Sequence, residues 1–266
     1  MYETRYHRPA DLAEAARLFS EGGDPRYISG GQTLIPTMKQ RLAAPTDVID
    51  LTRIEETKGI TVAPDAVTIG AAVTHFRVAN SKEVAAAIPA LADLAGMIGD
   101  PAVRHRGTLG GSLANNDPAA DYPAAVMALG ATVHTTKRAL QAEDYFQGLF
   151  TTALEDGEII TRVSFPVPEK AAYMKFRNPA SRYAMAGAFV AKMRDGSVRV
   201  GITGAGQNGV FRATDIEAAL TASWTPDAVD AVTIDESEML SDIHGSAAYR
   251  ANLVKVMAKR AVAAAG

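Results

Sequence analysis

The most informative absence in this 266-residue sequence is cysteine, of which there is none. A chain without cysteine forms no disulfide, offers no thiolate nucleophile and has no sulfur ligand for zinc or for an iron–sulfur cluster. We therefore expect any such cluster to lie on another chain. The histidines show no metal-ligand spacing of the H-x-x-x-H kind, so we also expect no metal site here; they are His7, His75, His105, His134 and His244.

The sequence also lacks an excess of one charge and a long apolar run. Lys and Arg number 27, against 30 Asp and Glu, and the basic residues are scattered, so we expect no nucleic-acid partner. No apolar stretch reaches the roughly 18 residues of a membrane span, and the start, residues 1–11, is too charged for a signal peptide. We expect a cytoplasmic protein without a membrane span. G-x-S-x-G and P-loop motifs are missing too, so neither hydrolase nor P-loop chemistry is indicated.

The length and the pattern of elements predict two units. Composition is that of a globular protein, with 47% hydrophobic and 21% charged residues, and this length suits two compact domains. Pro166 and Pro168 follow a predicted strand and stop it, so we place a boundary at residue 168. We expect a first domain over 1–168, divided into subdomains of about 1–57 and 58–168, and a second over 169–266.

Helix and strand signals alternate through both units. Asp11 and Glu14 form a capping box that predicts the first helix. Further predicted helices cover residues 34–42, 74–98 with a break at Pro89, a short stretch ending at 129, 215–222 and 247–265. Predicted strands cover 26–29, 48–51, 60–62, 67–69, 132–135, 159–165, 184–193 and 198–202. The last two flank Arg194-Asp195-Gly196-Ser197, which is typical of a hairpin turn.

Two glycine pairs stand beside hydroxyl and amide side chains, in Ser29-Gly30-Gly31-Gln32-Thr33 and in Thr108-Leu109-Gly110-Gly111-Ser112. Because glycine has no Cβ, adjacent glycines let successive N–H groups turn toward one anion and let that anion approach the backbone. The two segments are therefore candidate loops for a diphosphate. The alternative is that both are ordinary steric turns.

Short polar side chains follow the second pair. Asn115, Asn116, Asp117 and Asp121 can hydrogen-bond sugar or ribityl hydroxyls, although such residues also cap turns, as we expect of Asp117-Pro118. Just past the predicted boundary, residues 173–178 and 181–183 combine aromatic and cationic side chains. These could line a cleft between the domains, or form an ordinary boundary strand with surface charge.

A third glycine-rich segment, Gly204 to Gly209, matches the dinucleotide motif G-x-G-x-x-G. The strand before it pairs through a hairpin rather than a crossover, and the capping box Thr214–Glu217 starts the next helix five residues past the last glycine. The glycines therefore miss the helix N-terminus. We interpret the segment as a tight turn, with nicotinamide binding as the alternative.

The two glycine segments, extended to Ser29-Gly30-Gly31-Gln32-Thr33-Leu34-Ile35-Pro36 and to Thr108 through Asp121, resemble the FAD-binding medium subunit of the molybdenum hydroxylases. That family includes aerobic carbon monoxide dehydrogenase, nicotine and nicotinate dehydrogenases and the flavin domain of xanthine dehydrogenase. The likeness spans nearly the whole chain. Ser29, Thr33 and Leu109 depart from common family residues, and each departure is conservative.

The resemblance implies an α+β fold. It comprises a two-subdomain FAD-binding domain of the PCMH (vanillyl-alcohol-oxidase-like) type, then a smaller α+β C-terminal domain whose antiparallel sheet covers the flavin. Non-covalent FAD is the implied cofactor. The implied diphosphate residues are Ser29, Gly30, Gly31, Gln32, Thr33, Leu34, Thr108, Gly110, Gly111 and Ser112. Asn115 and Asp121 would meet the ribityl or ribose hydroxyls, and Leu154, Lys175 and Tyr183 the flavin ring. Lys175 would stabilise reduced flavin, and Tyr183 would control access to it.

The resemblance further implies a role in electron transfer. The chain would take electrons from iron–sulfur clusters on a partner chain and pass them to an external acceptor. It implies a large molybdenum-binding subunit and a small subunit with [2Fe-2S] clusters as partners. The alternatives are a self-sufficient FAD-dependent oxidase, a nicotinamide-dependent dehydrogenase using Gly204 to Gly209, and a scaffold that has lost its cofactor.

Overall fold

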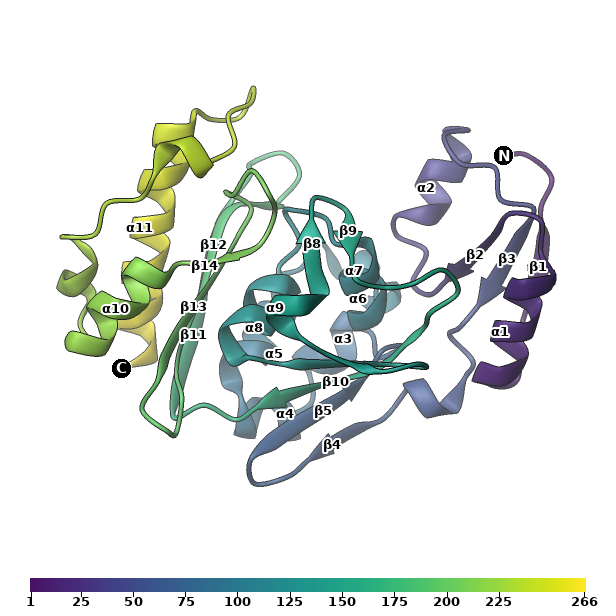
Figure 1. Ribbon diagram of the computed structural model, residues 1–266, viewed down its shortest axis with the longest axis horizontal. Coiled ribbons are helices and arrows are strands. Elements are labelled where there is room, and N and C mark those ends of the chain that lie inside the picture. Colours follow the sequence, from purple (N-terminus) through teal and green to yellow (C-terminus); the bar gives the residue numbers. More distant parts are fainter.

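Three main β-sheets follow one another along the chain and across the molecule (Figure 1). The computed structural model describes every residue from 1 to 266. The first sheet lies at one end with the N-terminus, and the last helix lies at the other end with the C-terminus. We call residues 1–57 the first subdomain, 58–168 the second subdomain and 169–266 the C-terminal region.

The first subdomain is built on a small parallel sheet with strand order β1-β3-β2. Its elements are β1 (Arg5–His7), α1 (Leu12–Glu21), β2 (Pro25–Ile28), α2 (Leu34–Lys39), β3 (Asp47–Asp50) and the 3₁₀ helix η1 (Glu55–Thr57). The Asp11 cap is confirmed, because its side chain accepts from the Glu14 N–H; the Glu14 carboxylate reaches back to the Ala10 N–H, one residue before the position that a capping box uses. The helix predicted over 34–42 ends earlier, at Lys39, because Arg41 takes a left-handed conformation with φ +61°.

The second subdomain is built on a five-stranded antiparallel sheet with order β4-β5-β10-β6-β7. Its strands are β4 (Ile60–Val62), β5 (Ala66–Gly70), β6 (Thr132–Thr135), β7 (Ala139–Gln141), β10 (Ile160–Pro166) and the separate pair β8 (Phe146–Gly148) and β9 (Thr151–Thr152). Its helices are α3 (His75–Ala79), α4 (Lys82–Ala87), α5 (Pro89–Gly96), α6 (Pro101–Arg106), α7 (Leu109–Asn115), α8 (Tyr122–Leu129) and α9 (Ala142–Tyr145). The helical stretch predicted over 74–98 breaks at Ser81 as well as at Pro89, because the Ser81 side chain caps α4.

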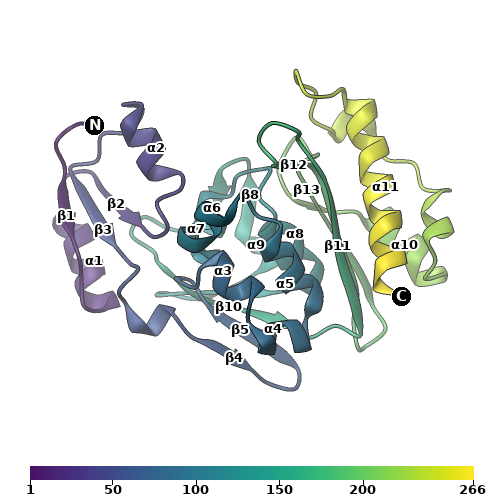
Figure 2. The ribbon, with the colours of Figure 1, turned by 180° about the vertical axis from the view of Figure 1, so that it is seen from behind.

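The C-terminal region is a four-stranded antiparallel sheet between two sets of helices (Figure 2). Its elements are β11 (Lys170–Arg177), β12 (Ala184–Lys192), β13 (Val198–Thr203), β14 (Phe211–Arg212), α10 (Thr214–Ala222), the 3₁₀ helices η2 (Pro226–Val229) and η3 (Glu236–Glu238), and α11 (Ala247–Ala265). The predicted hairpin is confirmed, with Gly196 at φ +86°. One face of the sheet packs on α5 and α8 and the other on α10 and α11, so β12 is buried on both faces.

Two large cores result from this layering. One joins the helices and sheet of the second subdomain to Tyr173 and Phe189 of the C-terminal sheet. The other lies between that sheet and α10 and α11. The chain passes between the two sheets within residues 167–169, where the predicted boundary at Pro168 falls. No helix combines the length and the apolar character needed to cross a bilayer.

Candidate functional site

One large cavity, of about 840 Å³, opens where the first subdomain, the second subdomain and β11 meet. Ligand pockets span about 300 to 1,000 Å³, so this volume suits a large ligand. All the residues that the resemblance assigned to FAD line it: Ser29, Gly30, Gly31, Gln32, Thr33, Leu34, Thr108, Gly110, Gly111, Ser112, Asn115, Asp121, Leu154, Lys175 and Tyr183. The fold thus brings together residues from segments that lie far apart in the sequence. Asn116, a further polar candidate, does not line it, because its buried amide donates to the Gly148 and Thr151 carbonyls.

The first glycine segment presents unused backbone donors to this cavity. It follows β2 directly, and Gly31 has φ +71°, which glycine adopts at low cost. The backbone N–H groups of Gly30, Gly31, Gln32 and Thr33 donate to no group in the protein. Consecutive free N–H groups beside a cavity form a concavity suited to a phosphate or diphosphate.

The second glycine segment differs from its prediction as a loop. Gly110 and Gly111 lie in the first turn of α7, because Thr108 caps that helix through its hydroxyl. The Gly110 N–H donates to the Ala71 carbonyl at 2.8 Å, and the Gly111 N–H donates to Thr108 Oγ1 at 3.1 Å. Both donors are therefore engaged within the protein. The expectation that both pairs offer free N–H groups holds only for the first pair.

The two segments touch one another across the cavity wall. A Cβ on Gly30 would lie 2.3 Å from the Arg106 carbonyl oxygen, so the backbone of the first segment runs directly against the end of α6. The hydroxyls of Ser29 and Thr108 are 2.9 Å apart and share a hydrogen bond. These contacts fix the distance between the two halves of the wall.

Gly111 leaves space in the cavity because it has no side chain. A Cβ on Gly110 would lie 2.6 Å from the Ala71 Cβ, so packing within the protein requires that glycine. A Cβ on Gly111 would meet only Thr108 Oγ1 at 3.0 Å and the Ser29 Cβ at 3.8 Å. The space beside Gly111 is thus part of the cavity, as expected where a ligand approaches the backbone closely.

A buried ionic cluster lies where β11 borders the cavity. Lys175 Nζ is 2.9 Å from the Asp121 carboxylate, and the side chains of the pair are 1% and 5% exposed. The Tyr173 hydroxyl donates to the same carboxylate at 2.5 Å. Burial raises the pKa of Asp121, and the Lys175 ammonium opposes this rise. The sequence placed Asp121 and Lys175 in separate roles, whereas the fold pairs them.

Tyr183 lies in the turn between β11 and β12 and is 54% exposed. Burial of its remaining surface, together with Asp117 and Asp121, raises the pKa of its phenol. Arg182 beside it takes a left-handed conformation, with φ +63°. The turn therefore presents an aromatic ring at the cavity from a constrained backbone.

Many further residues line the cavity without any sequence pattern that pointed to them, among them His75, Ile98 and Glu158. His75 is 5% exposed and its Nδ1 has no hydrogen-bond partner. Burial, with a smaller effect from Arg104, lowers its pKa to about 4, so the imidazole is neutral at neutral pH. Ile98 and Gly99 precede Asp100, whose side chain caps α6. That helix cap is the only nearby sequence signal, and it indicates a helix start rather than a cavity.

The third glycine segment does not reach the cavity. Gly206 and Gly209 line a separate pocket of about 230 Å³ that shares no lining residue with the large one. Gly204 has φ +82°, and a Cβ there would lie 2.4 Å from the Ala184 carbonyl oxygen. This geometry supports the interpretation of a tight turn.

Comparisons with known proteins agree with this architecture. The model of a family described as the FAD binding domain in molybdopterin dehydrogenase matches residues 2–168. The carbon monoxide dehydrogenase medium chain of Afipia carboxidovorans is 35% identical, over 97% of this chain and 94% of the relative. The nicotine 6-hydroxylase medium subunit of Paenarthrobacter nicotinovorans is 36% identical, over 98% of this chain and 97% of the relative.

A solved structure gives the same picture in three dimensions. A chain in a crystal structure of Cu,Mo-CO dehydrogenase in its cyanide-inactivated form superposes with a TM-score of 0.91 at 35% identity. The match covers 99% of this chain and 97% of that chain. The expected α+β fold, with its antiparallel C-terminal sheet, is therefore confirmed.

Proposed function

The chain belongs to the family of FAD-binding domains in molybdopterin dehydrogenases, and from this premise we propose its place in the enzyme. It is an FAD-containing oxidoreductase subunit of the molybdenum hydroxylase type, similar to the medium chain of carbon monoxide dehydrogenase. We propose that it receives electrons from [2Fe-2S] clusters on a small partner subunit and passes them to an external acceptor. A large partner subunit would bind the molybdenum cofactor and the organic or gaseous substrate.

The proposal depends on one observation: the same cavity holds unbonded backbone N–H groups and open space beside a glycine. The free N–H groups of residues 30–33 suit the negative charge of a diphosphate, and the gap beside Gly111 admits its close approach. The Ser112 hydroxyl and the Asn115 amide, both without a partner in the protein, suit further polar groups of FAD. Because cysteine is absent, no thioether to the flavin can form, and we propose non-covalent binding.

The flavin, when bound, supplies the electron-carrying chemistry, while the protein binds it, orients it and shields it. In this proposal, Leu154, Lys175 and Tyr183 border the ring. The Lys175 ammonium would stabilise negative charge on the ring. Because the Asp121 carboxylate already pairs with Lys175, this stabilisation would be weaker than that from an unpaired ammonium. Tyr183, being half-exposed on a turn, would govern access from solvent.

Electron delivery from outside the chain follows from its composition. The chain has no cysteine with which to hold a cluster, so the clusters of the complete enzyme must be ligated elsewhere. The medium-chain and medium-subunit names of the relatives fit a heteromeric assembly. The substrate pocket would then lie on a different subunit from the flavin.

The test is to follow FAD and electrons separately. The full chain should bind FAD with one-to-one stoichiometry and release it unmodified on denaturation. With a dye acceptor and an oxidisable substrate of the complex, the isolated chain should show no turnover, and turnover should appear only when the co-purifying partner chains are present. A chain that stays colourless after incubation with FAD would favour the scaffold. Turnover by the isolated chain would favour the self-sufficient oxidase.

A further inference from the structure

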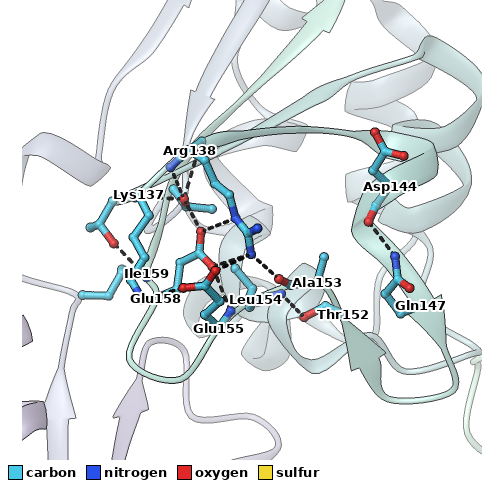
Figure 3. A network of polar contacts seen from close by, with 12 residues as sticks. Lys137, Arg138, Asp144, Gln147, Thr152, Ala153, Leu154, Glu155, Glu158 and Ile159 are labelled. Atoms are coloured by element: carbon cyan, nitrogen blue, oxygen red, sulfur yellow. Dashed lines mark hydrogen bonds and ion pairs between the residues drawn. The ribbon is translucent and has the colours of Figure 1, made fainter.

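The loop that carries Leu154 is held by a buried carboxylate (Figure 3). The Glu158 side chain is fully buried and faces the cavity side of the loop between β9 and β10. Four donors converge on it: the Thr135 hydroxyl at 2.6 Å, Arg138 Nε at 3.2 Å, Arg138 Nη2 at 3.1 Å and the Glu155 N–H at 2.8 Å. Burial alone would raise the pKa of Glu158. The hydrogen bonds and the Arg138 charge together outweigh that effect, so the pKa is lowered and the carboxylate is ionised at neutral pH.

Arg138 joins this carboxylate to the other end of the loop. Its Nη2 also donates to the Ala153 carbonyl at 2.6 Å, one residue before Leu154. Glu158, in turn, accepts from the N–H of Glu155, one residue after Leu154. The backbone on both sides of Leu154 is therefore tied to one ion pair (Figure 3).

The opposite side of the same loop touches the first subdomain. The Tyr27 hydroxyl donates to the Gly157 carbonyl at 3.2 Å, and Tyr27 stacks on Phe19 with ring centroids 4.6 Å apart. A Cβ on Gly157 would lie 3.0 Å from the Phe19 ring. Ile159, the next residue after Glu158, belongs to the apolar cluster of the first subdomain. The loop thus bridges the two halves of the cavity.

We propose that Arg138 and Glu158 are positioning residues that hold Leu154, and with it the spacing of the two subdomains, in the arrangement that binds the flavin. The inference rests on the proposed function, because it assumes that the cavity takes FAD. Neither residue acts on electrons itself. Each acts through the backbone of residues 153–157, and its effect reaches the flavin through Leu154 and the bridge to Tyr27.

A neighbouring ion pair supplies a matched control. Lys137 Nζ is 2.9 Å from the Glu155 carboxylate, but these side chains are 47% and 55% exposed. Exposed pairs contribute little to stability. Arg138 is itself 39% exposed, but its partner Glu158 is fully buried, so removing Arg138 leaves a buried carboxylate without its counter-charge. Arg138→Met and Lys137→Met each remove one positive charge from adjacent positions of the same turn. Only the first releases the Ala153 carbonyl and strands the Glu158 carboxylate.

The experiment uses the full chain loaded with FAD and measures the dissociation constant of FAD and the visible circular dichroism of the bound flavin. For Arg138→Met we expect the dissociation constant to rise about tenfold or more and the flavin dichroism to change. For Lys137→Met we expect the dissociation constant to change by less than about twofold and the dichroism spectrum to stay the same. Arg138→Lys should fall between them, because one ammonium can take the place of Nη2 between Glu158 and Ala153 but not of Nε, which makes the second contact to Glu158.

The outcomes separate this inference from the proposed function. If the wild-type chain binds no FAD, the proposed function fails and the inference fails with it. If the wild-type chain binds FAD and Arg138→Met lowers only the melting temperature, with the same dissociation constant and dichroism, the positioning role alone is overturned. If Arg138→Met does not fold, the double variant Arg138→Met/Glu158→Gln removes the stranded charge. That variant should fold yet bind FAD weakly, and wild-type affinity in it would overturn the inference.

Discussion

The first subdomain buries an apolar cluster of four residues, whereas the second subdomain shares with the C-terminal sheet a cluster of thirty-two. One of the four, Ile159, comes from outside the first subdomain. A unit of this size with so small a core is marginal by itself. The cavity wall formed by the second subdomain and the C-terminal sheet is therefore rigid through its own packing. The wall formed by the first subdomain depends for its position on its contacts with residues 157–159, with the end of α6 and with a bound ligand.

The largest effect should follow from filling the cavity beside Gly111. In Gly111→Leu the new side chain occupies the space next to Ser29 rather than a packed core. We expect FAD affinity to fall about a hundredfold or more, since charge-assisted hydrogen bonds to the diphosphate are each worth about 1.5 to 3 kcal/mol and two or more would be lost. Titration with FAD measures the affinity, and thermal unfolding of the apoprotein measures its stability. An apoprotein that melts many degrees lower would mean that Gly111 serves packing instead.

The unequal cores should be visible directly in hydrogen exchange. Without FAD we expect amides of β2 and β3 to exchange about tenfold faster or more than those of β12, because local opening costs less where fewer apolar contacts break. Saturating FAD should protect β2 and β3 preferentially, because it binds only the closed arrangement. Equal exchange in both regions, with or without FAD, would remove the basis of the comparison.

Acid should weaken the first subdomain through Asp47. This carboxylate is 3% exposed and contacts Arg5 at 2.9 Å and His7 at 2.7 Å, while the Thr46 hydroxyl donates to it at 2.7 Å. Those hydrogen bonds hold the pKa of Asp47 well below its usual value near 3.8. The unfolded state therefore binds the proton more readily, so this stabilisation is present above about pH 4 and is lost progressively as the pH falls below it.

The measurement for Asp47 is unfolding by urea at a series of pH values, in the wild type and in Asp47→Asn. The variant should be less stable at neutral pH and should show a shallower decline below about pH 4. Parallel declines in the two proteins would assign the acid sensitivity to other carboxylates.

The smallest effect on the cavity should come from Gly206→Ala. A Cβ there would lie 2.6 Å from the Gly209 carbonyl oxygen and 2.8 Å from the Phe211 ring, so overpacking should lower stability by about 1 to 3 kcal/mol. FAD content should stay at the wild-type level, because this pocket shares no residue with the large cavity. An emptied flavin site in a folded Gly206→Ala protein would contradict our assignment of the glycine segments.

Local signals predicted much of the fold, and the residues that the resemblance assigned to FAD line one cavity. Asp11 and Gly196 acted through neighbours a few residues away, so a helix cap and a hairpin turn could be inferred from sequence alone. The second glycine pair was interpreted as an anion-binding loop because adjacent glycines can turn successive N–H groups toward one anion, whereas the Thr108 cap and the close fit of Gly110 on Ala71 favour α7.

Pairings between distant residues could not be predicted in the same way. Lys175 and Asp121 are 54 positions apart. Arg138, in the turn between β6 and β7, is 20 positions from Glu158, which lies just before β10. Nothing in the local sequence of Glu158 distinguishes a buried ligand of Arg138 from an exposed loop carboxylate. Such contacts depend on strand register and loop closure, which the sequence pattern leaves open.

The bridge between Tyr27 and Gly157 also sets an order of events during synthesis. These residues are 130 positions apart, and Ile159 of the same segment completes the apolar cluster around Ala15 and Ile49. Contacts of such long sequence separation form late, because the chain between them must close first. The N-terminal residues leave the ribosome first, yet their core cannot close until residue 159 has emerged. A nascent chain arrested before that point should leave β1 to β3 open to protease.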